Sequence, residues 1–289
     1  MEFWPKLQEL FPQDWPKHFQ AYEVLKNQYR LEKEGKISGT KVYILDDDWS
    51  DGTFILQDAE LYTVIYTLDE KCKRLREALL LLDWSKGPRI HPYLGRFKVA
   101  LNSVYEELKL PVLYDGDMLW HWIHRDTAIN FNVEHPEAYV DQLKEFEADY
   151  INQFWPHKYE GSENWLRSLI RKNISKGVYL KSNNKLVAWV LRMDSGIITS
   201  LHTHPDYVRK GFGALALKAI AKAIAEQGSD SVGCIVNGNY RSTALFDKLG
   251  FTSQGPMHWS KTAPFKTSTN TYSRFIESQN TVARRESIK

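Results

Sequence analysis

The sequence predicts a two-domain α/β protein whose second domain contains a β-meander followed by alternating helices and strands. Its 289 residues are too many for one average domain and suit two. Runs of strand composition alternate with runs of helical periodicity along the chain, and three strand-like runs in the second half follow one another as a meander. We expect a first α/β domain at residues 1–140, a second domain at 141–262 and a polar tail at 263–289.

The first domain is expected to open with a helix from Glu2 to Leu31, where apolar residues recur at helical spacing. Strand-like runs rich in Val, Ile, Tyr and Thr follow at Lys41–Leu45 and Ala59–Tyr66, and they flank a turn-forming acidic segment at 46–52. An amphipathic helix is expected over Glu70–Trp84, with Leu side chains on one stripe.

The second domain is expected to follow an acidic connector at residues 132–137. Its strands are separated by Asn, Asp, Ser and Gly turns, and its helices end at Gly. The expected order is a helix around Trp165–Arg171, strands at Gly177–Leu180, Leu186–Met193 and Ile197–Thr203, a helix at Gly211–Gln227, a strand at Ser231–Val236, a helix at Tyr240–Leu249 and a strand at Phe251–Trp259. The tail is predicted to be partly disordered, with one short element near Tyr272–Ile276.

Composition excludes several classes of function. Lys plus Arg (38) nearly balance Asp plus Glu (36), so the chain lacks the basic field that nucleic-acid binding needs. No apolar run is long enough to cross a bilayer. The two cysteines, Cys72 and Cys234, lie far apart without metal-binding spacing, so we expect no metal site, no disulfide framework and a cytoplasmic protein.

One segment has the pattern of an anion site. The strand ending at Thr203 leads through a turn containing Gly211 and Gly213 directly into a helix. Glycine lets an anion approach the backbone, and the first amide groups of a helix point at it unsatisfied. Arg209 and Lys210 add positive potential. The spacing fits neither a Walker A motif nor a full dinucleotide-binding fingerprint, and a tight turn at a helix start remains the simpler alternative.

The residues from about Ile151 to Trp259 resemble the GNAT superfamily of N-acyltransferases, and within it the C-terminal domain of glycine N-acyltransferases. The superfamily has a strand, a proline, a glycine-containing turn and a helix, then a later Asn and a terminal Leu-Gly-Phe. The matching residues here are Pro205, Gly211, Gly213, Asn239 and Leu249-Gly250-Phe251, and the narrower likeness lies in Ile151–Trp155, Gly161–Glu163, Trp189 and Pro205–Tyr207. The resemblance implies a GNAT fold for the second domain, an α/β fold with a mixed, mostly antiparallel sheet flanked by helices, and the first α/β domain can then be a degenerate copy of the same fold.

The resemblance implies a bound acyl-CoA, either acetyl-CoA or a longer acyl-CoA, and a small-molecule amine as acceptor, with glycine or another small amino acid as the expected class. Main-chain groups of Leu201, His202 and Thr203 would meet pantetheine, and Asn239 would approach the same arm. The diphosphate would be held by the turn and the helix start, which comprise Arg209, Lys210, Gly211, Phe212, Gly213 and Ala214.

The sequence departs from the family at three positions. Val208 stands where the family usually has Arg or Gln. By an ungapped count, the glutamate that serves as base falls on Ile197, and the helical tyrosine that serves as acid falls on Phe246. Replacements are His202 as base, because imidazole titrates near neutral pH, and Tyr240 or Ser242 as acid.

Each of these replacements has a plainer interpretation, as half-exposed strand-end histidines or as helix caps. Two other functions therefore stay open. One is a catalytically inactive CoA-binding or protein-interaction module with the same fold, and the other is a protein or peptide N-acetyltransferase. The oligomeric state does not follow from the sequence.

Overall fold

The structure is a computed structural model that describes residues 3–265. The element expected near Tyr272–Ile276, and all of the expected tail after residue 265, lie outside the described residues. Within residues 3–265 no helix combines the length and the apolar character that a membrane span requires. Cys72 and Cys234 are not joined in a disulfide within the described residues.

The chain forms two compact units. Unit 1 contains the described residues up to Met118 and those from Gly255 onward, and unit 2 runs from Leu119 to Gln254. Two long strands, β5 (Val112–Ile123) and β11 (Thr252–Thr262), give residues to both units. Residue 140, where the sequence predicts a domain boundary, lies in strand β6 (Ala138–Asp141) of unit 2, and a division into folding domains at that point stays a prediction.

Unit 1 has strand order β1-β2-β3-β4-β11-β5. The pairs β1–β2, β2–β3 and β4–β11 are antiparallel, whereas β3 and β4 run parallel with helix α3 between them in sequence. Its other elements are α1 (Trp4–Gln8), α2 (Phe19–Lys33), β1 (Lys41–Tyr43), β2 (Phe54–Gln57), β3 (Tyr62–Tyr66), α3 (Lys73–Leu81), η1 (Trp84–Lys86), β4 (Arg89–Leu94), η2 (Gly95–Phe97) and α4 (Lys98–Glu107).

Unit 2 has strand order β5-β10-β9-β8-β7-β6. Strands β6 to β9 are antiparallel, and β9 pairs with β10 in parallel across helix α8. Its other elements are α5 (Arg125–Ala128), η3 (Glu145–Glu147), α6 (Ala148–Phe154), α7 (Ser162–Lys172), β7 (Ser175–Leu180), β8 (Leu186–Arg192), β9 (Ile198–Thr203), η4 (Pro205–Tyr207), α8 (Phe212–Glu226), β10 (Ser231–Val236) and α9 (Tyr240–Lys248).

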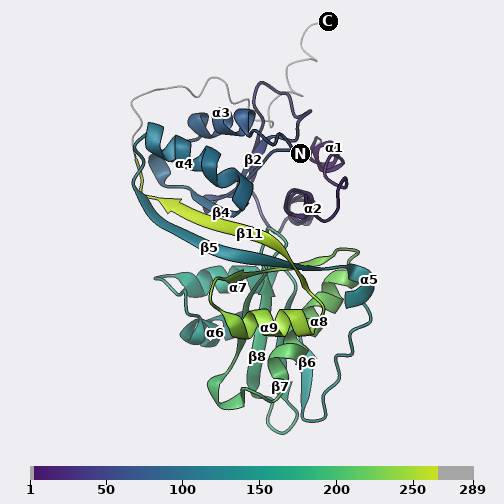
Figure 1. The fold of residues 1–289 in the computed structure, drawn as a ribbon. Coiled ribbons are helices and arrows are strands. Elements are labelled where there is room, and N and C mark those ends of the chain that lie inside the picture. The colour runs from purple at the N-terminus through teal and green to yellow at the C-terminus, as the bar shows by residue number, and fades with distance from the viewer. Residues whose placement is uncertain (1–2, 266–289) are drawn as a thin grey trace, which may run out of the picture. The chain divides into compact units, whose positions relative to one another are not determined.

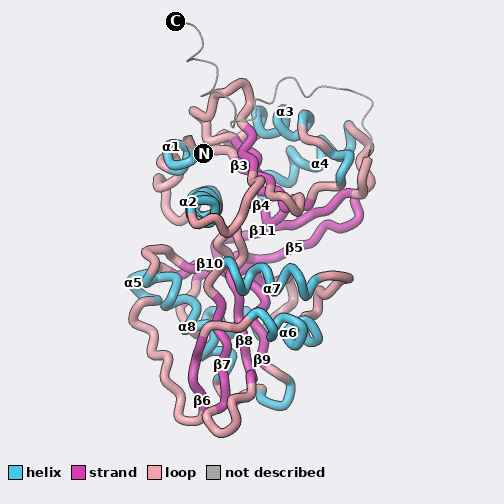
Figure 2. The backbone as a smooth tube through the Cα atoms, turned by 180° about the vertical axis from the view of Figure 1, so that it is seen from behind, coloured by secondary structure: helices cyan, strands magenta, loops and turns pink. Residues whose placement is uncertain are grey.

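The helices of unit 2 cover both faces of its sheet, with α8 and α9 on one face and α6 and α7 on the other (Figures 1 and 2). Alternation along β8 explains this arrangement, because successive strand side chains point to opposite faces. Trp189 and Leu191 pack with α6 and α7, while Ala188 and Val190 pack with α8. The predicted fold class is confirmed: an α/β fold with a mixed, mostly antiparallel sheet between helices in unit 2, and a second α/β unit that contains most of the earlier residues.

In the first domain one predicted helix is divided, one predicted strand begins later than expected and one strand was not predicted. The expected helix from Glu2 to Leu31 is split into α1 and α2, because Pro16 in the intervening turns has no amide hydrogen for a continuous helix. The sequence also missed β2, whose residues Phe54–Gln57 are mostly buried and show no polar alternation. The strand expected from Ala59 begins only at Tyr62, after a turn that Asp58 caps by accepting from the amide of Tyr62.

Candidate functional site

A gap in the strand pairing beside β9 marks the candidate site. The parallel pairing of β9 and β10 places Gly233 opposite Ile198, the first residue of β9. Although β9 stands between two strands in the sheet order, its residues 199–203 are half-exposed, whereas Ile198 is buried. This pattern indicates that the strands diverge beyond Ile198. The exposed edge of β9 can then pair with an extended ligand through its main chain.

A β-bulge lies at the point where the strands diverge. Opposite β8, the register places Thr199 beside Leu191 and His202 beside Trp189, so β9 carries one extra residue. Ser200 in this stretch has a left-handed backbone, with φ 52°, and its hydroxyl is buried without a partner in the described structure. A bulge re-aims side chains locally, and here it brings His202 to the face of the sheet that α6 covers.

The N-terminus of α8 lies on the other face. Gly211 precedes the helix with a left-handed φ of 84°, and no side chain caps it. The amide of Leu215 donates to the carbonyl oxygen of Gly211 and begins the helical hydrogen bonding. The amides that precede it in the first turn of α8 therefore remain available to a ligand. A Cβ added at Gly211 would meet nothing within 4 Å. The helix therefore presents free donors and the positive end of its dipole to open space, which suits a diphosphate.

The structure brings two groups of predicted site residues together. A Cβ on Gly213 would lie 2.9 Å from the Thr203 hydroxyl oxygen, so the helix start packs directly on β9. Leu201 packs into the core on the α8 side, and Thr203 faces the same way. Around the turn, Arg209, Lys210 and Gly211 are exposed, Gly213 and Ala214 are half-buried, and Phe212 is buried as an anchor.

The same Gly213 position connects the helix start to α9, because its added Cβ would lie 3.8 Å from Leu245. At the start of α9, Asn239 uses its side-chain oxygen to cap the helix and accepts from the amide of Ser242. Tyr240 is 82% exposed and Ser242 is half-buried. Asn239 therefore has a structural role as the cap of α9, and in the described structure neither Tyr240 nor Ser242 is hydrogen-bonded to residues 209–214.

Unit 1 repeats the strand–helix–parallel-strand motif but not the open turn. The loop between β3 and α3 contains Asp69, whose carboxylate accepts from the amides of Lys71 and Lys73, each at 2.9 Å. These hydrogen bonds hold the pKa of the Asp69 carboxyl below its usual range. A carboxylate of the chain itself thus occupies the donors that a diphosphate would need, and only unit 2 offers this kind of site in residues 3–265.

His202 is the titratable side chain beside the strand gap. Its ring lies between Trp189, with centroids 5.1 Å apart, and Phe154 at 6.0 Å. The Nε2 atom is buried and has no hydrogen-bond partner in the described chain. Burial lowers the pKa of His202, and His204 lowers it further. Burial therefore favours the neutral form of the His202 ring, which is the form that can accept a proton.

The positions that depart from the family pattern are occupied by apolar side chains with packing roles. Ile197 is 2% exposed and ends the turn between β8 and β9. Phe246 is 4% exposed and covers Gly233, where an added Cβ would come within 2.3 Å of its ring. Val208 is exposed in the loop before Arg209. None of these three side chains can transfer a proton.

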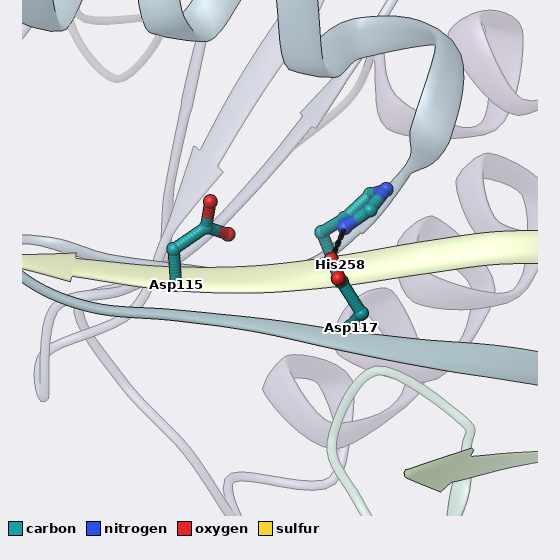
Figure 3. A group of neighbouring side chains, drawn as sticks. All are labelled: Asp115, Asp117 and His258. Atoms are coloured by element: carbon teal, nitrogen blue, oxygen red, sulfur yellow. Dashed lines mark hydrogen bonds and ion pairs between the residues drawn. The ribbon is translucent and has the colours of Figure 1, made fainter. Parts of the chain in front are cut away.

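A second polar cluster lies in unit 1, where Asp115 and Asp117 on β5 and His258 on β11 lie close together (Figure 3). Their ligand atoms are within 4.8 Å of one another, and His258 Nδ1 is 2.6 Å from Asp117. However, the Lys98 ammonium lies 3.3 Å from Asp115, 3.1 Å from Asp117 and 3.4 Å from His258. The cluster already contains a cation of the chain, so its donor set does not call for a metal ion.

Sequence reasoning missed Tyr150 and Phe154 on α6 as neighbours of His202 and His204. Their spacing of four residues puts both rings on one helix face, a signal that the sequence did contain. What the sequence could not indicate is that this face meets β9, because that contact joins segments about 50 residues apart.

Comparison with known proteins places this geometry in context. Residues 175–260 match the family model described as FR47-like protein, and no curated protein matches the chain. An X-ray structure of a Drosophila protein is similar with a TM-score of 0.81 at 20% identity, covering 91% of this chain and 96% of that one. A GCN5-related N-acetyltransferase from Kribbella flavida is similar with a TM-score of 0.49 at 12% identity, covering 84% and 96% of the two chains. A GCN5-related N-acetyltransferase-like protein from Streptococcus suis gives 0.48 at 11%, covering 91% and 99%.

Proposed function

We propose that the protein is an acyl-CoA-dependent N-acyltransferase whose donor binds to unit 2. The observation that supports this most is the uncapped start of α8, with Gly211 facing open space, beside the edge of β9 that faces β10, where the pairing of these two strands is seen only at Ile198. A diphosphate fits the helix start, and an extended amide-containing arm fits the strand edge. The match of residues 175–260 to a family model covers both features.

The donor site works through main-chain groups. Amides of Phe212, Gly213 and Ala214 would donate to the diphosphate, and Arg209 and Lys210 would add charge from the exposed turn. The edge of β9 would hold the pantetheine arm. Since backbone donors provide most of this recognition, Val208 in place of a side-chain donor lowers affinity without removing the site.

His202 is the proposed base. A bound acyl-CoA supplies a thioester carbonyl carbon, which the amine attacks. The C–N bond forms, the C–S bond breaks, the proton of the amine goes to His202 Nε2, and the thiolate takes a proton from water, Tyr240 or Ser242. The lowered pKa keeps His202 able to accept a proton at pH 7. Positioning of donor and amine would provide much of the remaining rate enhancement.

The proposed acceptor is a small-molecule amine, with glycine or another small amino acid as the first class to test, and the proposed place of action is the cytoplasm. A rival function is a CoA-binding module without catalysis. It is favoured by the apolar side chains at Ile197 and Phe246, which provide neither base nor acid. Turnover distinguishes the two, because both bind CoA.

The first experiment is thermal unfolding with acetyl-CoA, with dephospho-CoA and ATP as comparison ligands. A ligand that binds only the folded state at 100 times its Kd stabilises it by about 2.7 kcal/mol. A clear rise in Tm with CoA species supports the donor site and justifies a screen of amines by release of free thiol. A folded protein whose Tm none of these ligands raises would refute the proposed function.

A further inference from the structure

The first half of strand β5 has an edge that its neighbours do not cover. In the sheet order β5 lies between β11 and β10, but β10 has only six residues and β5 has twelve. β10 belongs to unit 2, whereas the residues of β5 up to Met118 belong to unit 1. Residues 112–117 are exposed apart from the half-buried Gly116. This stretch therefore offers one edge along which another strand can pair.

The side chains at the start of this edge are apolar. Val112 is 43% exposed, Leu113 61% and Tyr114 47%. Successive strand side chains point to opposite faces, so the three residues expose apolar surface on both faces of the sheet. Natural proteins protect such edges with Lys or Pro, and this triplet contains neither. An exposed apolar edge of this kind is typical of a surface that another chain covers.

The two ends of the apolar triplet carry opposite charge. On the C-terminal side, Asp115 and Asp117 share the ammonium of Lys98, at 3.3 and 3.1 Å, so this cluster is net negative while His258 is neutral (Figure 3). On the N-terminal side, Lys109 is exposed, and no carboxylate of residues 3–265 forms an ion pair with it. The edge thus runs from a basic end, through an apolar centre, to an acidic end.

We propose that a second copy of this chain pairs with this edge, antiparallel and related by a two-fold axis. Antiparallel pairing centred on the apolar triplet sets the apolar residues of the two copies against each other. It also brings Lys109 of each copy to the acidic end of the other, whereas parallel pairing would bring like charges together. The edge is therefore complementary to itself, as a two-fold interface requires. This interface is separate from the proposed acyl transfer, and neither depends on the other.

The mass of the protein in solution provides the first test. Light scattering over a range of concentrations should show a rise from 33.7 kDa toward twice that mass. Leu113→Lys places an ammonium of each copy at the centre of the pairing, and it should raise the Kd of the dimer about tenfold or more. Since Leu113 is exposed in the single chain, circular dichroism should show an unchanged fold. Phe146→Lys, a similar change at a 77% exposed position of unit 2, is the matched control and should leave the Kd unchanged.

Cysteine cross-linking tests the arrangement of the two copies. In a two-fold antiparallel pair, the residue on the axis faces its own copy at a Cα separation that a disulfide can span, about 4.4–6.8 Å. A residue one position away from the axis lies about 8 Å from its own copy, because it is two residues out of register. Of Val112→Cys, Leu113→Cys and Tyr114→Cys, oxidation should therefore link one variant only. The wild type, in which Cys72 is buried and Cys234 half-buried, gives the background.

Reversing one charge tests the complementarity of the ends. Lys109→Glu should weaken the dimer, because attraction to the acidic end becomes repulsion. Added salt screens both, so it should weaken the wild-type dimer and strengthen that of Lys109→Glu. The same response to salt in both proteins would contradict the antiparallel arrangement.

Other results would overturn the interface itself. A mass of 33.7 kDa at every concentration would mean that no second copy binds. Equal weakening of the dimer by Leu113→Lys and Phe146→Lys, or no link in any of the three cysteine variants, would place the contact between copies elsewhere. Links in all three variants would show parallel pairing and refute the two-fold arrangement.

Discussion

Replacing Gly211 with valine separates binding at the start of α8 from simple damage to the helix. Gly211 has φ 84° and Gly228, just beyond the other end of α8, has φ 73°, and an added Cβ meets nothing within 4 Å at either position. A residue with a Cβ in the left-handed region costs about 1–2 kcal/mol, so both variants lose similar stability. For a unit of this size, that corresponds to a fall in Tm of about 2–8 °C.

Only Gly211→Val should also weaken CoA binding. The valine side chain would fill the open space in front of the first helical amides, which we propose as the diphosphate position. Loss of one hydrogen bond to a charged group costs about 1.5–3 kcal/mol, equivalent to a roughly 10- to 150-fold rise in Kd. Isothermal titration of CoA into the wild type, Gly211→Val and Gly228→Val measures this directly, with circular dichroism to confirm that each protein is folded.

The comparison can fail in two informative ways. If Gly211→Val binds CoA as tightly as the wild type does, the start of α8 is not the diphosphate site. If Gly228→Val loses binding to the same extent, the effect of both substitutions is a general distortion of α8. In either case the reasoning from the free amides is refuted.

Three further measurements test other parts of the argument. If His202 is the base, the rate falls only once its ring is protonated. Because burial favours the neutral ring, the acid limb of the pH–rate profile should lie below the usual histidine pKa of 6.5. The variant His202→Ala should remove this limb while keeping CoA affinity. Gly233→Ala should destabilise the protein by about 1–3 kcal/mol in urea unfolding, because the new methyl group meets the Phe246 ring at 2.3 Å, and an unchanged midpoint would contradict that packing. Titration should give one CoA per chain, because the Asp69 carboxylate accepts from the amides of Lys71 and Lys73 in unit 1; two sites in the wild type would show that this carboxylate does not block unit 1.

Local sequence was sufficient for most of unit 2. The strand at Ser231–Val236 was predicted with the bounds that the structure gives, and the predicted helix at Gly211–Gln227 differs from α8 by one residue at each end. These elements are bounded by glycine and by abrupt changes of periodicity, which act within a few residues. The proposal of an anion site at the turn containing Gly211 follows from the same local signals, because helix-terminal amides need no distant partner to be free.

Only the tertiary structure decided the rest. The membership of β5 and β11 in two units depends on which strands they pair with, and nothing in their own residues specifies that choice. The environment of His202, between Trp189 and Phe154, and the unpaired hydroxyl of Tyr150 exist because α6 packs on β9. The sequence by itself thus determined the fold class and the turn suited to the donor. The burial of His202 and the lack of a partner for its Nε2 atom became visible only in three dimensions, because burial and missing partners are properties of contacts between distant segments.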